Sequence, residues 1–316
     1  MQTPSQRILV TGALGHIGSR LIHDLPAWSA APSVLVDNMA TQRYPALFNL
    51  PSGGRYLFHE ADAMGSRLPE FLEATDVVVH LAAITDAAGS FERAAEVERV
   101  NYEGTRILAE ACARAGKRLV FLSTTSVYGT QSRIVDEGCG LDELKPQSPY
   151  ADSKLRAEQY LARLVHTQGL LCVILRFGTI FGVSPGMRFH TAVNKFIWQA
   201  VNGLPLTVWR SALDQRRPYL DLEDAVRALH HVVERDLFDG TVYNVLTCNL
   251  TVREIISAIE REVSPVRVEL VDSQIMNQLS YEVATARFCA TGFRFTGSLD
   301  RGVRDTVKLL AGIRRG

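Results

Sequence analysis

The sequence has few cysteines, no metal-binding histidine spacing and no long apolar run, and its charges cancel. Its five cysteines include no CxxC pair and its eight histidines form no HxH or HExxH, so neither disulfides nor a metal site is expected. The 34 basic and 34 acidic side chains provide no electrostatic footprint for nucleic acid or an anionic membrane. No apolar run approaches the ~18 residues of a membrane helix, and no signal-peptide pattern precedes the first strand. These absences predict a cytoplasmic protein without a metal, nucleic-acid or membrane partner.

The remaining composition is typical of a globular α/β protein. With 316 residues, 47% hydrophobic and 22% charged, the chain can bury a large core in one domain or in one large and one small domain. Its first half alternates continuous β-branched runs (residues 7–11, 33–37, 55–59, 76–80, 118–123 and 171–175) with amphipathic helical stretches, notably 91–115 and 150–168. This alternation predicts a doubly wound parallel sheet of the Rossmann type.

After residue 180 the pattern changes to shorter segments of both kinds. Helical periodicity recurs at residues 191–202, 222–235, 251–263 and 299–310, and short strands are expected at 206–209, 241–245 and 266–270. We therefore expect a Rossmann domain over residues 1–178 and a smaller mixed α/β substrate lobe over 179–316, with segments near 215–246 returning to the first domain.

Three glycines follow the first predicted strand and open the first predicted helix. Gly12, Gly15 and Gly18 are spaced as GxxGxxG. Glycine lets the backbone turn sharply and approach a pyrophosphate, whose charge then meets the helix N-terminus. Such glycines also serve tight strand–helix packing, but their place directly after the first strand favours a dinucleotide site.

Acidic residues further along suit the adenosine half of such a cofactor. Asp37, followed by Asn38, ends the second strand about 20 residues after the glycines, where a carboxylate binds the ribose hydroxyls and repels a 2′-phosphate. This predicts NAD rather than NADP, although Arg43 follows within reach. Asp62 suits a hydrogen bond to the adenine amino group, and a turn aspartate explains it almost as well.

Several motifs together resemble a known enzyme family. The TGALGHIG loop is followed by HLAA at 80–83, STTSVYG at 123–129 and YADSK at 150–154, and later by LRFGTIFG, RPYLDLEDA and VYNV. In order and spacing they resemble the extended short-chain dehydrogenase/reductases, and more narrowly the NAD-dependent sugar-nucleotide epimerase/dehydratase family with its UDP-glucose 4-epimerase-like members. The resemblance covers nearly the whole chain. It implies an NAD-dependent enzyme acting on a nucleotide-diphosphate sugar.

Elementary chemistry of the YADSK motif agrees with this resemblance. Tyr150 and Lys154 stand at i and i+4 and therefore share one helix face. A nearby ammonium favours the phenolate and lowers a tyrosine pKa from about 10 toward neutrality. Tyr150 is then a general base toward a sugar hydroxyl, and an acid in the reverse direction. The alternative interpretation of the motif is an exposed tyrosine beside a solvated lysine, with no catalytic role.

The resemblance also assigns roles to individual residues. It implies catalysis by Thr124, Tyr150 and Lys154, with Ser123 and Thr125 offering the same hydroxyl one position away, and a structural role for Asn101. Expected cofactor contacts are Gly12, Gly15, His16, Ile17, Gly18, Asp37, Asn38, Asp62, Ala63, Leu81, Ala82, Ala83, Tyr150 and Lys154. Expected substrate contacts are Thr85, Thr125, Ser126, Thr179 and Arg217. Of these, Arg217 or its neighbour Arg216 would meet the diphosphate, whereas Thr179 replaces an asparagine that is usual in the family.

Two positions distinguish the reactions known in the family. Members that dehydrate have carboxylates directly after the catalytic threonine, and members that decarboxylate usually have a glutamate there. This chain has Thr125 and Ser126, which supply no low-pKa proton shuttle. The pattern favours 4-epimerisation through a transient 4-keto sugar. Dehydration assisted by Asp86 or Glu92, a simple reductase or dehydrogenase, and an NAD-binding regulator without turnover are the alternatives.

The sequence leaves the base and the sugar open. Asn277, Gln278 and Tyr281 are candidates for contacting the base, or for capping and packing a helix. The stretches 91–115 and 150–168 carry alanines and aliphatic residues beyond one core stripe, and related enzymes pair such helices across a two-fold axis. We therefore expect a homodimer.

Overall fold

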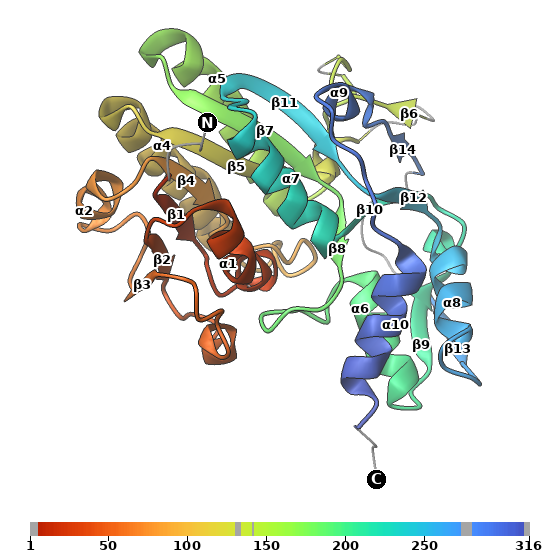
Figure 1. The fold of residues 1–316 in the computed structure, drawn as a ribbon. Helices are drawn as coiled ribbons and strands as arrows, with labels where there is room; N and C mark the ends of the chain where they lie inside the picture. Colours follow the sequence, from red (N-terminus) through yellow and green to blue (C-terminus); the bar gives the residue numbers. More distant parts are fainter. Residues whose placement is uncertain (1–5, 130–133, 141, 273–279, 313–316) are drawn as a thin grey trace.

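The computed structural model describes residues 6–129, 134–140, 142–272 and 280–312. A seven-stranded sheet forms the centre of the larger lobe, with the order β11-β7-β5-β4-β1-β2-β3 (Figure 1). Each neighbouring pair in it is parallel. The strands are β1 (Ile8–Thr11), β2 (Ser33–Asp37), β3 (Tyr56–Glu60), β4 (Val77–His80), β5 (Arg118–Thr124), β7 (Leu171–Phe177) and β11 (Asp239–Val245). The predicted doubly wound α/β fold is confirmed.

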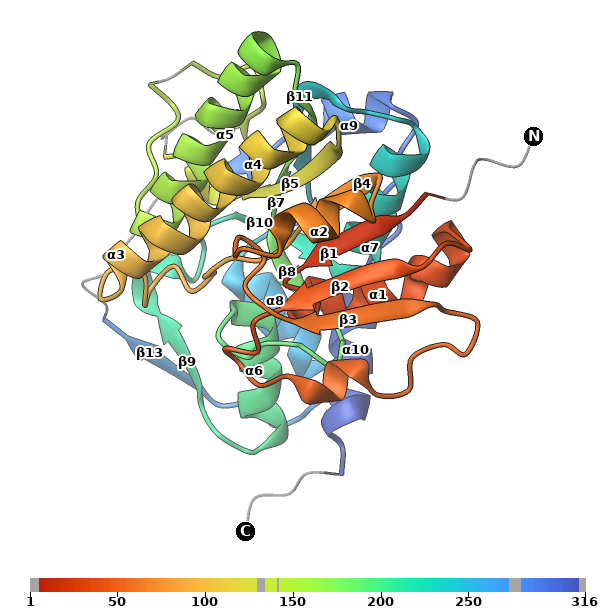
Figure 2. The ribbon, with the colours of Figure 1, turned by 90° about the vertical axis from the view of Figure 1, so that its left-hand side faces the viewer.

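Helices cover both faces of this sheet, which explains why its strands are apolar without alternation. On one face Val10 of β1 packs in a core with α1 (His16–Trp28) and α7 (Leu222–Glu234). On the other face its neighbour Leu9 packs with α2 (Leu68–Glu73), α4 (Gly104–Ala115) and α5 (Pro149–Gln168). Figure 2 shows α4 and α5 lying side by side on this second face. Within the described residues no helix combines the length and the apolar character needed to cross a membrane.

The helix predicted over residues 91–115 is not continuous. It consists of α3 (Ala94–Val97), a π-helical turn (Glu98–Glu103) and α4. Asn101 lies buried in the π-helical turn, where its side chain accepts from Ile84 N at 2.8 Å and donates to Ile84 O at 2.9 Å. It also donates to Ser153 Oγ on α5 at 3.3 Å. Asn101 thus links the segment after β4 to α5, in keeping with the structural role expected for it.

A smaller lobe packs at one end of the large sheet. It contains a three-stranded sheet, β12-β10-β8, and a two-stranded sheet, β13-β9, packed with α6, α8 and α10 around a separate core. The bounds are β8 (Thr179–Phe181), α6 (Ala192–Val201), β9 (Leu206–Trp209), β10 (Arg217–Asp221), β12 (Cys248–Leu250), α8 (Val252–Glu260), β13 (Val268–Val271) and α10 (Leu299–Leu310). Short pieces complete the fold: β6 (Ile134–Val135), β14 (Glu282–Val283) and α9 (Ala286–Ala290).

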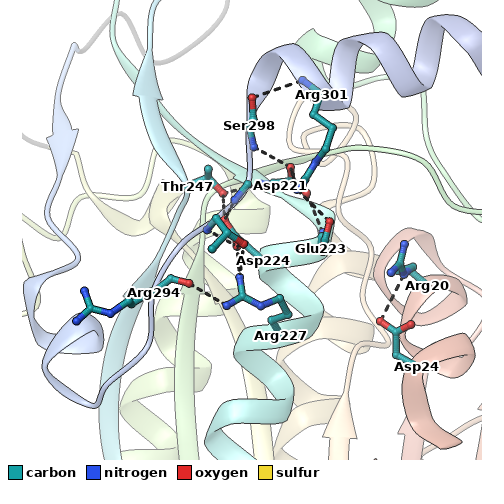
Figure 3. Close-up of polar contacts among 12 residues, drawn as sticks. Arg20, Asp24, Asp221, Glu223, Asp224, Arg227, Thr247, Arg294, Ser298 and Arg301 are labelled. Carbon is teal, nitrogen blue, oxygen red and sulfur yellow. Dashed lines mark hydrogen bonds and ion pairs between the residues drawn. The ribbon is translucent and has the colours of Figure 1, made fainter. Parts of the chain in front are cut away.

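Two buried carboxylates fix the start of α10 at the junction of the lobes (Figure 3). Asp224, fully buried on α7, accepts from the backbone N–H groups of Thr296 and Gly297, both at 2.9 Å, and from Thr247 Oγ1 at 2.8 Å. Asp221 caps the N-terminus of α7 and accepts from Ser298 N at 3.1 Å. The two side chains therefore anchor the C-terminal segment to the helix that covers the large sheet.

Candidate active site

The glycine-rich segment links β1 to the first turn of α1 and has no space for a side chain at Gly12 or Gly18. Gly12 has a φ of +66°, and a Cβ there would lie 2.7 Å from Ala82 N; a Cβ on Gly18 would lie 2.6 Å from Gly12 O. Helix α1 starts without a side-chain cap and without an acidic residue in its first turn. Its first N–H groups are therefore available to an anion. This backbone cradle fits the pyrophosphate of a dinucleotide.

Asp37 holds this loop against the end of β2. Its carboxylate accepts from Leu14 N at 3.0 Å and from Met39 N at 2.9 Å. A carboxylate accepts about four hydrogen bonds, so acceptor positions remain for ribose hydroxyls. Arg43 lies near enough for the Asp37 charge to raise its pKa, although burial is the larger influence and lowers that pKa overall.

The other residues expected near the adenosine form turns around the loop. Asn38 is exposed and accepts from Ala40 N at 3.1 Å. Asp62 is exposed and accepts from Met64 N at 3.0 Å, as a turn aspartate does. Ala63 is buried in the core beside α2, and Ala82 N donates to Thr11 Oγ1 at 3.4 Å. None of these, nor Asp37, lines the large cleft described next.

A cleft of about 460 Å³ runs from the glycine loop to the smaller lobe. It unites fifteen of the residues expected at the site: Gly12, Gly15, His16, Ile17, Gly18, Leu81, Ala83, Thr85, Thr124, Thr125, Ser126, Tyr150, Lys154, Thr179 and Arg217. These come from both lobes, so the cleft joins the cradle to the side chains predicted to take part in catalysis.

The hydroxyl groups of Thr124 and Tyr150 meet in this cleft. Thr124 ends β5, and its side chain is hydrogen-bonded to the Tyr150 phenol and accepts from Ser126 N at 3.1 Å. The hydroxyl of Thr125 instead donates to the backbone O of Phe177 at 3.3 Å. This arrangement favours Thr124 over Thr125 as the partner of Tyr150 at a reacting oxygen.

The pKa expected for Tyr150 is wrong in direction. Burial raises its pKa above 10, and the hydrogen bond from Thr124 and the charge of Arg188 counteract this only in part. Lys154 does not point its ammonium at the phenol: Nζ donates to Leu122 O at 2.8 Å and lies 4.7 Å from the centre of the Phe121 ring. Helix spacing places the two residues on one face, but packing against β5 directs the lysine. Burial lowers the pKa of Lys154 to about 8.

At the far end of the cleft the structure separates two neighbouring arginines. Arg217 lines the cleft, with its guanidinium 5.2 Å from the centre of the Tyr281 ring. Arg216 points away, toward Glu282 at 3.4 Å and the backbone O of Asn249 at 3.0 Å. Tyr281 also donates to Thr125 O at 3.2 Å, so it connects Arg217 to the turn that follows β5. The other two candidates for contacting the base, Asn277 and Gln278, lie outside the described residues.

Arg188 is a cleft residue that the sequence motifs missed. It is partly buried, Nη1 donates to Thr85 Oγ1, and Nε has no hydrogen-bond partner within the described residues. Its loop is held to the cofactor lobe by His16, whose Nε2 donates to Gly182 O at 2.8 Å. Burial lowers the pKa of His16 to about 4, so the imidazole is neutral at pH 7. The signal in the sequence that could have identified Arg188 was a cationic residue in a loop with glycine and proline after β8.

The carboxylates considered for dehydration differ in position. Asp86 lines the cleft, and its Oδ1 accepts from Gly89 N at 3.1 Å. Glu92 is exposed and is not part of the cleft. Across the described residues no group of three or more His, Cys, Asp or Glu side chains is arranged to hold a metal ion.

Comparison with known proteins gives consistent relatives. Residues 8–245 match the model of the NAD dependent epimerase/dehydratase family. The chain is 30% identical to an uncharacterized UDP-glucose epimerase of Bacillus subtilis over 248 residues, covering 76% of each chain. It is 28% identical to mouse dTDP-D-glucose 4,6-dehydratase, covering 96% of this chain and 88% of the relative. Among solved structures, UDP-glucuronic acid 4-epimerase from Bacillus cereus, with UDP-glucuronic acid and NAD, superimposes with a TM-score of 0.85 at 27% identity, covering 96% and 99% of the two chains.

Proposed function

Since the chain belongs to the NAD-dependent epimerase/dehydratase family, we propose that it is a sugar-nucleotide epimerase that inverts C4 of a hexose through a transient 4-keto sugar. The observation that carries the proposal is the pair of residues after Thr124. Thr125 and Ser126 both line the cleft, and neither supplies the acidic proton that expulsion of a C6 hydroxyl requires. NAD is the cofactor of the family, and it supplies a hydride acceptor at C4 when bound.

The side chains of the cleft have distinct tasks in this reaction. Tyr150 removes the proton from the C4 hydroxyl and returns it at the end of the cycle. Thr124 bonds to Tyr150 and holds the reacting oxygen in line with the phenol. The guanidinium of Arg188 supplies positive charge that favours the phenolate. Lys154 lines the same cleft, where its ammonium is available to the ribose of the cofactor.

Arg217 suits the diphosphate of the substrate. Its guanidinium is partly buried, stacks on Tyr281 and faces the cleft, where a planar fork binds phosphate oxygens in pairs. Anchoring the diphosphate leaves the sugar free to turn between removal and return of the hydride. Epimerisation needs this rotation, because the two steps occur on opposite faces.

A 4,6-dehydratase is the second candidate, and Asp86 favours it. This carboxylate lines the cleft, so it is available as a proton shuttle outside the usual positions. The similarity to mouse dTDP-D-glucose 4,6-dehydratase is consistent with this reading.

Product analysis with UDP-, dTDP- and GDP-hexoses, including UDP-glucuronic acid, distinguishes these reactions. Epimerisation gives a product of unchanged mass and inverted C4, without added reductant. A product lighter by one water, formed by the unmodified protein and no longer formed by Asp86→Asn, would establish the dehydratase instead. Stoichiometric NADH would indicate a dehydrogenase, and stabilisation by NAD without any hydride exchange would indicate a regulator.

We also propose a homodimer built on α4 and α5. Ile107 of α4 is 37% exposed, and around it Arg106 forms ion pairs with Glu103 and Glu110, both at or below 2.9 Å. In an isologous two-fold contact across this face, the positive charge of Arg106 in one copy faces the negative charges of Glu103 and Glu110 in the other. Light scattering at micromolar concentration should give twice the monomer mass, and Ile107→Glu should lower it; a monomer in the unmodified protein would contradict the proposal.

A further inference from the structure

A buried ion pair lies directly behind the catalytic residues. Glu158 stands one helical turn beyond Lys154 on α5, and its carboxylate accepts from Arg176 Nε at 3.0 Å and from Arg176 Nη2 at 2.6 Å. The two side chains are 5% and 6% exposed. A pair so removed from water needs good hydrogen bonding to be tolerated, and each nitrogen and oxygen atom of the two charged groups has a hydrogen-bond partner.

The pair belongs to a longer buried chain of hydrogen bonds. Arg176 Nη1 donates to Tyr128 Oη at 2.9 Å, and Tyr128 in turn donates to Asn244 Oδ1 at 2.9 Å. Tyr128 and Asn244 are fully buried. The chain of hydrogen bonds thereby connects α5 to β7, to β11 and to the turn that follows β5. A buried polar network of this kind fixes a single arrangement of the elements that it joins.

This network reaches both halves of the Thr124–Tyr150 contact. Ser123, the residue before Thr124, donates its hydroxyl to Glu158 Oε1. Glu158 also shares its helix face with Tyr150 and Lys154, because the three are spaced by four residues. One carboxylate therefore holds the strand end that carries Thr124 and the helix face that carries Tyr150.

Glu158 is also the acidic group that faces Lys154. Its charge raises the pKa of Lys154 against the larger effect of burial. Among the described residues, the other titratable groups near this lysine are Tyr150, one turn away on the same helix, and His80 on β4, on which the charge of Lys154 acts. Burial lowers the pKa of His80 to about 3, so it is uncharged at neutral pH and does not replace Glu158.

We propose that Glu158 and Arg176 are a positioning pair for the reaction: they hold the end of β5 that carries Thr124 against the face of α5 that carries Tyr150 and Lys154, and the Glu158 carboxylate is the buried counter-charge of Lys154. The inference rests on the proposed roles of Tyr150 and Lys154. It applies equally to epimerisation and dehydration, because both begin with removal of hydrogen from C4.

The test separates charge, geometry and stability with three variants. Glu158→Gln removes the negative charge of the pair, and Arg176→Lys keeps the positive charge but not the planar fork. The double variant E158Q/R176M removes both charges of the pair, so Arg176 is not left as an unpaired buried charge and the Tm should recover relative to Glu158→Gln. Asp224→Asn is the matched control, since it alters another buried carboxylate that anchors α10 and lies outside the cleft. Two quantities are measured for each: the pH profile of the NADH signal on adding sugar nucleotide, and the pH dependence of Lys154 acetylation, read by peptide mass spectrometry.

In Glu158→Gln and in the double variant, the midpoint of Lys154 acetylation and the alkaline limb of the rate should move down by about one pH unit. Arg176→Lys should keep both midpoints while kcat falls about tenfold through misplacement of Thr124. Asp224→Asn should lower Tm and leave both midpoints in place. Recovery of the midpoints together with Tm in the double variant, or an equal shift in Asp224→Asn, would overturn the inference. Because acetylation needs no turnover, it tests the pair even if no sugar nucleotide reacts, an outcome that would refute only the proposed function.

Discussion

The two ends of the cleft are built in different ways. At the cofactor end, the cradle comes from one stretch of seven residues, Gly12 to Gly18, and it works through backbone N–H groups and missing side chains. At the sugar end, the cleft is formed by side chains from separate segments, among them Thr124 of β5, Tyr150 of α5, Arg188 after β8 and Arg217 of β10. The first end is local in sequence, whereas the second exists only after both lobes have packed.

Because the two ends are built differently, substitutions at each end should change a different property of the protein. At the cofactor end, exchange of the acidic side chain at Asp37 should alter which dinucleotide binds, whereas a side chain at Gly12 or Gly18 would clash with the backbone of the cradle. At the sugar end a change of one side chain alters the rate, since the reacting atoms depend on distances between elements.

The largest effect on the rate is expected for Tyr150, at the sugar end of the cleft. Tyr150→Phe removes the proton carrier and keeps the ring, so folding and NAD binding should persist while kcat falls at least about 100-fold. Calorimetry with NAD and product analysis measure the two quantities. Near-normal turnover in the folded variant would show that Tyr150 is not the acid–base group.

The neighbouring threonines should differ sharply although they are adjacent in sequence. Thr124→Val loses the hydroxyl bonded to Tyr150 and should cost about 100-fold in kcat. Thr125→Val loses a bond to Phe177 O and should cost less than about tenfold. If steady-state rates show the reverse order, the catalytic hydroxyl is that of Thr125.

Arg188 allows a test of charge at the sugar end. Its guanidinium lowers the pKa of Tyr150 against the effect of burial, so Arg188→Met should raise that pKa and move the acidic limb of the pH–rate profile to higher pH. At neutral pH the rate should fall about tenfold for each pH unit of this shift. Arg188→Lys should restore the limb, and an unchanged limb in Arg188→Met would remove Arg188 from the chemistry.

The smallest effect is expected for cofactor choice. NAD should bind at least about tenfold tighter than NADP, or about 1.4 kcal/mol, because Asp37 repels a 2′-phosphate. Asp37→Ala should abolish this preference and leave Arg43 free to meet the phosphate, whereas Asn38→Ala should change it little. Equal affinities of the unmodified protein for both dinucleotides, measured by calorimetry, would refute the role of Asp37.

Much of the larger lobe was predictable because its signals are local. Continuous apolar runs mark strands that helices cover on both faces, and each predicted run overlaps a strand of the large sheet. The short strands β8, β10 and β12 were not predicted, because none of them is a continuous apolar run like the strands of the large sheet. The π-helical turn at 98–103 was missed for a related reason: a helical pattern of apolar residues continues across it, and the turn is fixed by the contacts of Asn101 with Ile84 and Ser153.

By itself, the sequence determined the fold class, through its alternating strand and helix patterns, and the glycine cradle, through a short run with fixed spacing. Its motifs also predicted Thr124, Tyr150 and Lys154 as the catalytic residues. Tertiary structure alone decided where the charges face. It directed Lys154 toward Leu122 O, brought Arg188 to Thr85, turned Arg217 into the cleft and Arg216 out of it, and placed Glu158 behind Ser123. The physical reason is that a long side chain of four or more rotatable bonds reaches several partners from one backbone position, and only the packing of distant elements selects among them.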